Sequence, residues 1–279
     1  YGGWEFGGEI KWPYGEFDQA PMLTRQPVET EEDIWSLEVP NVETAGIVPL
    51  MIEFNKLAMQ DTSDNNPFGV AASLQGPFAT ACNISPPEKF LKWIIKNPDA
   101  AHHLMRLATD HQIDLARYNA DTFGMEGNIA FIACPTSNNQ LISSKHFKDF
   151  VFPYQKELNE KILEMGFNHI FMHICGEHNK NLPYWAQIPM GDPGILSFGH
   201  EVKLETAAKY FPNDIIMGNL EPAILQTGTP DEVYEATKSV VEEGKKCPGG
   251  YIFAPGCELP PMAELENLHA MNKAVNDFG

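Results

Sequence analysis

The feature that most constrains the fold of this chain is a regular alternation of short apolar runs with stretches of helical periodicity. The apolar residues in each run are too continuous for one face of the strand to be exposed to solvent. Such runs are typical of parallel strands covered by helices. Each run ends in small or polar residues, at the position where parallel sheets place their sites. The six runs are residues 68–77 (FGVAASLQGP), 128–139 (NIAFIACPTSNN), 169–176 (HIFMHICG), 194–200 (GILSFGH), 214–222 (DIIMGNLEP) and 250–261 (GYIFAPGCELPP). The sequence therefore predicts an α/β fold.

Among parallel architectures the sequence favours a (β/α)8 TIM barrel, because no glycine-rich nucleotide fingerprint follows any of the runs. Six runs are two fewer than a barrel needs, so we expect the first two strands either upstream of Tyr1 or within the N-terminal residues. We expect two parts, an arm over residues 1–45 and a barrel domain over residues 46–279. Thr229 is the expected N-cap of a helix that has Pro230 in its first turn.

The N-terminal arm is rich in glycine, proline and aromatic residues (YGGWEFGGEIKWPYGEF), which predicts a hairpin or an irregular segment packed on the barrel. Its rings either pack against one another or form the roof of an apolar ligand pocket, and the sequence leaves both open. Trp4 and Trp12 are candidates for substrate contact, as is Gln75 at the end of the first apolar run.

Charge limits the partners that the chain can have. The formal net charge is −19, from 38 acidic and 19 basic residues, so the surface repels phosphate backbones and anionic membranes. There is no apolar stretch long enough to span a membrane and no visible secretory signal. The five cysteines are widely spaced and odd in number, unlike a disulfide framework. We therefore expect a cytoplasmic protein that binds neither nucleic acid nor membrane, and a homodimer is compatible with the sequence.

Three residues at strand ends form a candidate metal site. His173 and Cys175 lie two positions apart, so in a strand they project from the same face. Cys257 lies just past the last apolar run. One imidazole and two thiolates suit Zn²⁺, and three protein ligands leave a fourth position open for substrate. Spacing alone is equally compatible with buried, inert thiols.

The stretches HICG, GNLEP and APGCELPP resemble, in order and separation, the zinc methyltransferases of the uroporphyrinogen decarboxylase superfamily, from about Phe68 to the C-terminus. These enzymes transfer methyl groups to or from corrinoid proteins. The resemblance implies a (β/α)8 barrel, with His173, Cys175 and Cys257 as zinc ligands. Members of this family usually carry additional N-terminal sequence, which agrees with the two strands that are expected but not found.

The resemblance leaves the reaction to be chosen. Stretch APGCELPP, followed by LENLHAMNKAVNDFG, looks more like enzymes that demethylate methoxyaromatic compounds than like coenzyme M methyltransferases. We therefore expect zinc-dependent transfer of a methyl group from a methoxylated aromatic substrate to the Co(I) of a corrinoid protein. The alternative is methyl transfer from a corrinoid protein to a thiol such as coenzyme M. Uroporphyrinogen decarboxylation is disfavoured, because its substrate bears eight carboxylates and this chain has three arginines. A zinc-stabilised binding or scaffold barrel is the reading outside enzymes.

Further candidates follow the same strand ends. Glu221 is either a ligand or acid at the site or a helix cap, and His200 is either an outer ligand or a solvated loop residue. Asn219 is expected to orient the substrate or a ligand, whereas His178 is expected to be an ordinary loop residue. The chain has no corrinoid-binding sequence of the Asp-x-His-x-x-Gly type. The corrinoid (cobalamin) is therefore expected on a separate partner protein.

Overall fold

A computed structural model describes residues 2–15, 20–60, 72–124 and 129–279. Its main sheet has six parallel strands within these residues, one for each predicted apolar run. The first four residues of the first run, 68–71, lie outside the described residues. The strands are β3 (Ala72–Gln75), β4 (Ile129–Ala133), β5 (His169–Ile174), β6 (Ile195–Phe198), β7 (Ile215–Leu220) and β8 (Tyr251–Pro255).

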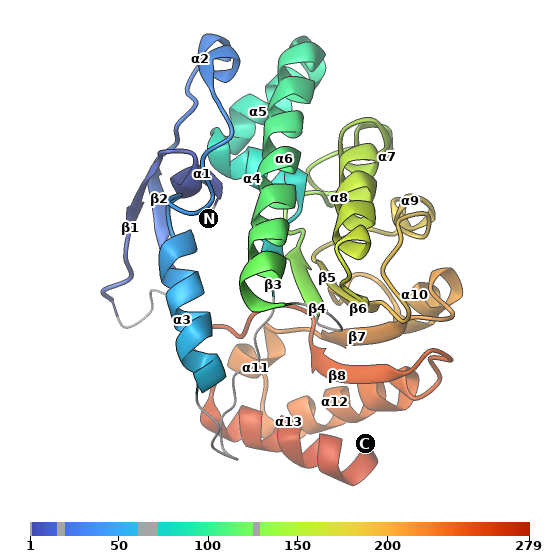
Figure 1. Ribbon diagram of the computed structural model, residues 1–279. Coiled ribbons are helices and arrows are strands. Elements are labelled where there is room, and N and C mark those ends of the chain that lie inside the picture. The colour runs from blue at the N-terminus through green and yellow to red at the C-terminus, as the bar shows by residue number, and fades with distance from the viewer. Residues whose placement is uncertain (1, 16–19, 61–71, 125–128) are drawn as a thin grey trace.

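The strand order identifies the type of α/β fold. Neighbours in the sheet follow one another in the chain, β3-β4-β5-β6-β7-β8, with helical segments in the connections (Figure 1). A doubly wound sheet reverses direction at a switch point, whereas a TIM barrel adds its strands in sequence. The chain therefore has the predicted TIM-barrel order.

Helices cover the sheet where the periodicity predicts them. In Figure 1, α6 and α8 lie beside the β3–β5 half of the sheet, and α12 and α13 beside β7 and β8. The helices are α1 (Gly2–Glu5), α2 (Glu31–Ser36), α3 (Val48–Gln60), α4 (Pro77–Ile84), α5 (Pro87–Lys96), α6 (Pro98–Phe123), α7 (Ser144–His146), α8 (Phe152–Glu164), α9 (Leu182–Trp185), α10 (Leu204–Tyr210), α11 (Ile224–Thr227), α12 (Pro230–Gly244) and α13 (Leu265–Phe278), with a π-helical turn at Phe147–Val151.

Local signals explain where key helices begin. Thr229 is the N-cap of α12, and its hydroxyl and the Glu232 side chain form a reciprocal capping box, which confirms the prediction for this residue. The break between α5 and α6 falls at Asn97, whose side chain caps α6 immediately before Pro98.

Strand register places one row of side chains on the inner face of the sheet. Cross-strand partners share a face, and the pairs Gln75–Ala133, Ala133–His173, His173–Ser197 and Ser197–Met217 connect five consecutive strands. His173 is therefore directed to the same side as the predicted residue Gln75, two strands away. The residues between them in each strand, such as Ile132 and Met172, are fully buried.

The N-terminal residues form a small antiparallel pair, β1 (Glu9–Lys11) and β2 (Met22–Arg25). The rings of Trp4 and Trp12 meet edge to face at 5.8 Å. The division into an arm over 1–45 and a barrel over 46–279 stays a prediction.

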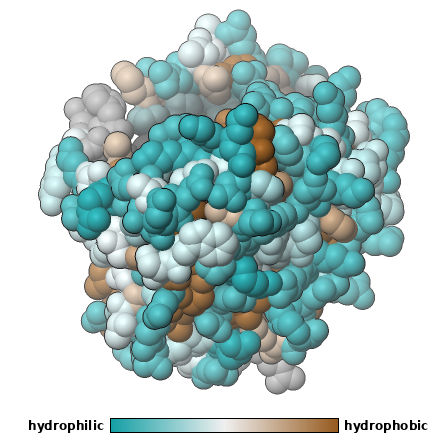
Figure 2. All heavy atoms as spheres, turned by 90° about the horizontal axis from the view of Figure 1, so that it is seen from above, coloured by the Kyte–Doolittle hydropathy of each residue, from teal (hydrophilic) through white to brown (hydrophobic). Residues whose placement is uncertain are grey.

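The described surface is polar over most of the face shown in Figure 2, with small, separated hydrophobic patches. None of the described helices combines the length and the apolar composition needed to cross a bilayer.

Candidate metal centre

The structure brings together the three predicted metal ligands. His173 lies in β5, Cys175 directly follows this strand, and Cys257 lies two residues past β8. One ligand atom from each residue lies within 4.8 Å of the other two. In a flat sheet, β5 and β8 would stand about 14 Å apart, because they are separated by three strand spacings. The curvature of a barrel is therefore what allows the two ends to share a site.

The distance between the two thiols fits a metal better than a disulfide. The Sγ atoms of Cys175 and Cys257 are 3.4 Å apart, and both cysteines are free. A disulfide requires about 2.05 Å. Two thiolates at about 2.3 Å from a tetrahedral Zn²⁺ stand about 3.8 Å apart, so a shift of a few tenths of an ångström would seat the ion. The donor set therefore fits zinc.

Ser197 orients the imidazole of His173. Its hydroxyl oxygen lies 3.0 Å from Nδ1 of His173, which leaves Nε2 directed to the thiols. Metal-binding histidines commonly use their second ring nitrogen in this way. Sequence reasoning did not single out Ser197, because its contact depends on the β5–β6 register. The available signal was one polar residue within the apolar run ILSF.

The pKa values of the two thiols are shifted in opposite directions. Hydrogen bonds from Cys175 and from His173 lower the pKa of Cys257 well below its usual range, although partial burial opposes them. The hydrogen bond to Cys257, together with burial, raises the pKa of Cys175, and the charges of Glu201 and Glu258 act in the same direction. These opposite shifts favour a single shared proton in the metal-free pair, with Cys257 as the thiolate.

This arrangement predicts selective alkylation of chelator-stripped protein by iodoacetamide. Cys257 should react first, and its rate should fall much less than the roughly tenfold per pH unit expected of an ordinary thiol below its pKa, between pH 8 and pH 6. Burial raises the pKa of Cys82 and Cys134 to about 12 each, so these thiols should react only on unfolding. Peptide mass spectrometry measures each site. An ordinary pH profile at Cys257 would contradict the shared proton.

Two glycines allow the loops around the site to approach closely. Gly176 has φ +87°, which favours glycine, and a Cβ there would stand 2.8 Å from the amide nitrogen of Asn138. A Cβ at Gly256 would stand 2.9 Å from the backbone nitrogen of His200. The β8 loop that carries Cys257 therefore packs directly on the β6 loop that carries His200.

Asn219 holds the β6 loop in place. Its amide nitrogen donates hydrogen bonds to the carbonyl oxygens of Gly199 (3.2 Å) and Val202 (2.6 Å). His200 is partly exposed within this loop, and its Nδ1 lies 3.7 Å from the carboxylate of Glu201. Glu201 was not singled out in the sequence, although its charge acts on Cys175. The predicted roles of Asn219 at the substrate and His200 as outer ligand stay predictions.

Glu221 stands beside the cysteine loop but outside the ligand cluster. It directly follows β7, and the backbone N–H of Gly256 donates to the carbonyl of Leu220 at 2.7 Å. Glu221 and Cys257 therefore each follow one member of a hydrogen-bonded pair. The Glu221 side chain is exposed, and its backbone carbonyl accepts from Ile224 at 3.3 Å. The predicted role of Glu221 as a ligand or acid stays a prediction.

Three residues predicted to contact the substrate have other contacts in the described structure. The Gln75 side chain accepts a hydrogen bond from Asn83 at 3.0 Å and borders a cavity of about 190 Å³. Trp12 borders a second cavity of about 310 Å³ beside α3, and Trp4 packs on Trp12. No described contact joins these residues to the metal cluster, so their role in substrate binding stays a prediction.

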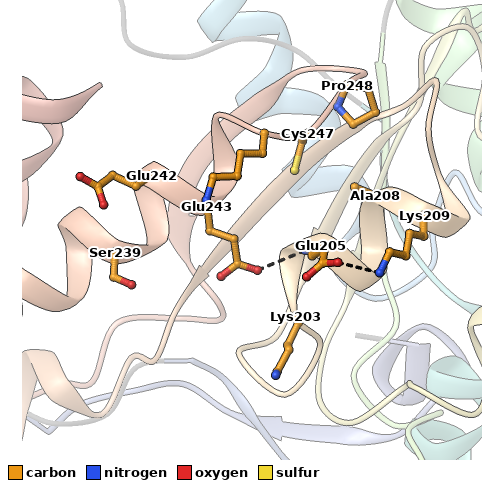
Figure 3. A pocket seen from close by; sticks show the side chains of 10 residues that line it. Lys203, Glu205, Ala208, Lys209, Ser239, Glu242, Glu243, Cys247 and Pro248 are labelled. Atoms are coloured by element: carbon orange, nitrogen blue, oxygen red, sulfur yellow. Dashed lines mark hydrogen bonds and ion pairs between the residues drawn. The ribbon is translucent and has the colours of Figure 1, made fainter.

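A larger groove, of about 660 Å³, lies on the outer side between α10 and α12 (Figure 3). Its side chains carry mixed charges, with Glu205 accepting from Lys209 at 2.7 Å. The metal cluster does not border this groove. We therefore place the candidate chemistry at the strand ends and not in this groove.

Comparison with known proteins agrees with this fold. The family model of uroporphyrinogen decarboxylase (URO-D) matches residues 3–278. The methylcobamide:CoM methyltransferase MtbA of Methanosarcina acetivorans is 28% identical over 280 residues, covering 98% of this chain and 76% of that protein. The methylated-thiol–coenzyme M methyltransferase of Methanosarcina mazei is 30% identical over 207 residues, covering 73% and 52%.

A solved structure supports the fold. The structure titled methyltransferase from Methanosarcina mazei aligns with a TM-score of 0.80 at 22% identity, covering 98% of this chain and 76% of that one. Together with the match over nearly all of the sequence, this shows that the chain belongs to the uroporphyrinogen decarboxylase (URO-D) family.

Proposed function

We propose that this protein is a zinc-dependent methyltransferase that moves a methyl group from a methoxylated aromatic substrate to the Co(I) of a separate corrinoid protein. The observation that carries the proposal is the convergence of His173, Cys175 and Cys257 at the carboxyl ends of β5 and β8. The corrinoid methyltransferases among the relatives support the reaction class.

The residues divide the reaction between them. Nε2 of His173 and the two thiolates would hold zinc, which supplies Lewis-acid polarisation of the ether oxygen. The O–CH₃ bond breaks and the methyl carbon is taken by Co(I), so the electron pair of that bond stays on the phenolate oxygen. Glu221 would supply the proton that converts this oxygen to a phenol, and His200 would act as an outer ligand or hydrogen-bond donor.

The positions of the arginines support an uncharged methyl donor. All three form ion pairs on partly exposed surface: Arg25 with Glu9, Arg106 with Asp110 and Glu157, and Arg117 with Asp114. Their N–O distances are 2.7–2.9 Å. A guanidinium group that is already paired with a carboxylate is not free to bind a substrate's sulfonate or carboxylate.

The names of the relatives favour a second candidate, methyl transfer from a corrinoid protein to a thiol such as coenzyme M. The same three ligands would bind zinc, and zinc would favour the thiolate form of the acceptor. The two functions share the site and the corrinoid partner and differ in the direction of transfer.

All five cysteines are free thiols, which supports our proposal of a cytoplasmic location.

One experiment separates the two functions. The purified protein is mixed with a reduced corrinoid protein and a panel of methoxyaromatic compounds, and the cobalt spectrum is followed. We expect the Co(I) spectrum to give way to that of the methylated corrinoid, with release of a phenol. Thiol-dependent demethylation of the corrinoid, with no reaction from any ether, would overturn our proposal in favour of the second candidate.

A further inference from the structure

A buried histidine follows one of the metal ligands in the chain. His178 occupies the loop between β5 and α9, three residues after Cys175, and is fully buried. The rings of Phe147 and Trp185 contact its imidazole edge to face, at 6.1 and 5.8 Å between centroids. His178 lies in a loop, as predicted, but its burial was not expected, because the surrounding sequence is polar.

Its hydrogen bonds determine which ring nitrogen carries the proton. An indole N–H can only donate, and Nε1 of Trp185 lies 3.1 Å from Nδ1 of His178. The amide nitrogen of Asn181 lies 3.2 Å from the same atom. Nδ1 is therefore an acceptor, and the proton is on Nε2. Burial lowers the pKa of His178 to about 3, so the ring is neutral at physiological pH.

The protonated ring nitrogen has no hydrogen bond of its own among the described residues. Nε2 is buried and has no partner within hydrogen-bond limits in the described part of the chain. The backbone of Cys175 acts on the ring as a hydrogen-bond acceptor, which raises the pKa and partly offsets the effect of burial. A buried donor without a partner is costly, which favours even a long contact with this carbonyl.

We infer that His178 is a positioning residue of the metal centre: held at Nδ1 by Trp185 and Asn181, it anchors the loop that carries Cys175 and so fixes the Cys175 thiol relative to His173 and Cys257. The opposite side of the loop is fixed independently. The backbone N–H of Asn139 donates to the carbonyl of Glu177 at 2.7 Å. Removing His178 would leave the loop held from one side only.

The inference rests on the proposed function only in taking zinc as the metal, and zinc binding is its readout. The first variant is His178→Leu, which removes both ring nitrogens. The second is His178→Gln, which keeps a hydrogen-bonding amide of comparable reach. His111→Gln is the matched control, because His111 is also fully buried but pairs with Glu5 at 2.7 Å, away from the metal cluster. Zinc affinity is measured by competition with a chromophoric chelator, and stability by urea unfolding of the zinc-free proteins.

We expect His178→Leu to weaken zinc binding about 10–100-fold, in the range of outer-shell partners of metal ligands, and His178→Gln to restore most of the loss. The control should be less stable than wild type and bind zinc normally. If His178→Leu does not fold, Trp185→Phe replaces it, since this change removes the donor to Nδ1 and should also weaken zinc binding. Wild-type affinity in His178→Leu, or in Trp185→Phe where it replaces that variant, would overturn the inference. So would an equal loss in His111→Gln.

Failure of the inference is distinguishable from failure of the proposed function. If the wild-type protein binds zinc and transfers methyl groups while the His178 variants bind zinc equally well, only the positioning role is wrong. If the wild-type protein binds no zinc, the proposed function and the inference are both wrong.

Discussion

Cys257→Ala and His173→Ala are each expected to remove most of the bound zinc and all measurable methyl transfer. The wild-type protein should contain about one zinc per chain, because His173, Cys175 and Cys257 form one three-ligand site. With one ligand gone, two protein donors remain, which is fewer than either structural or catalytic zinc sites use. Metal content is measured by elemental analysis after gel filtration, and activity by the corrinoid assay.

Cys247→Ala is the matched control for this prediction. Cys247 is also a free and largely buried cysteine, but it borders the groove between α10 and α12 and is not part of the ligand cluster. Its loss should leave both zinc content and turnover near wild type. Full zinc and full turnover in Cys257→Ala or His173→Ala would show that the metal site is misassigned.

The elements around this site could be predicted from the sequence because their signals are local. An apolar run with no wet face indicates a buried parallel strand, and a two-residue spacing places His173 and Cys175 on one face. The register of the sheet then carries His173 to the strand ends, as expected. The contact between Cys175 and Cys257 could not be predicted from the sequence pattern, because it depends on the curvature of the sheet between β5 and β8.

The surroundings of the ligands could not be predicted, because their contacts are tertiary. Ser197 reaches His173 only through the β5–β6 register. In the sequence, His178 lies in a polar stretch typical of a loop. Its burial depends on Trp185 in the next helix and on Phe147 in an earlier helical turn. Gln75 is a case of the opposite kind. It lies at a strand end as expected, but its side-chain oxygen is used by Asn83 within the fold.

Glu221→Gln is expected to cut the rate of methyl transfer by roughly 10²-fold, in the range typical of acid–base groups, while zinc content stays near wild type. The expectation rests on position. Glu221 follows β7 beside the loop that carries Cys257, since Gly256 donates to the carbonyl of Leu220 at 2.7 Å. The glutamine keeps the size and the polarity of the side chain but cannot donate a carboxylic proton to a departing phenolate.

Glu258→Gln separates this role from a general effect of charge. Glu258 is an exposed carboxylate directly after Cys257, and like Glu221 it is not part of the ligand cluster. If Glu221 acts as a proton donor, only its own substitution should lower the rate strongly. The loss of rate should be smaller for methyl donors whose phenolate is a good leaving group, because such groups need less help from an acid. Equal losses in both variants would indicate an electrostatic effect of the acidic rim. An unchanged rate in Glu221→Gln would leave Glu221 only the contact of its carbonyl with Ile224 at the start of α11.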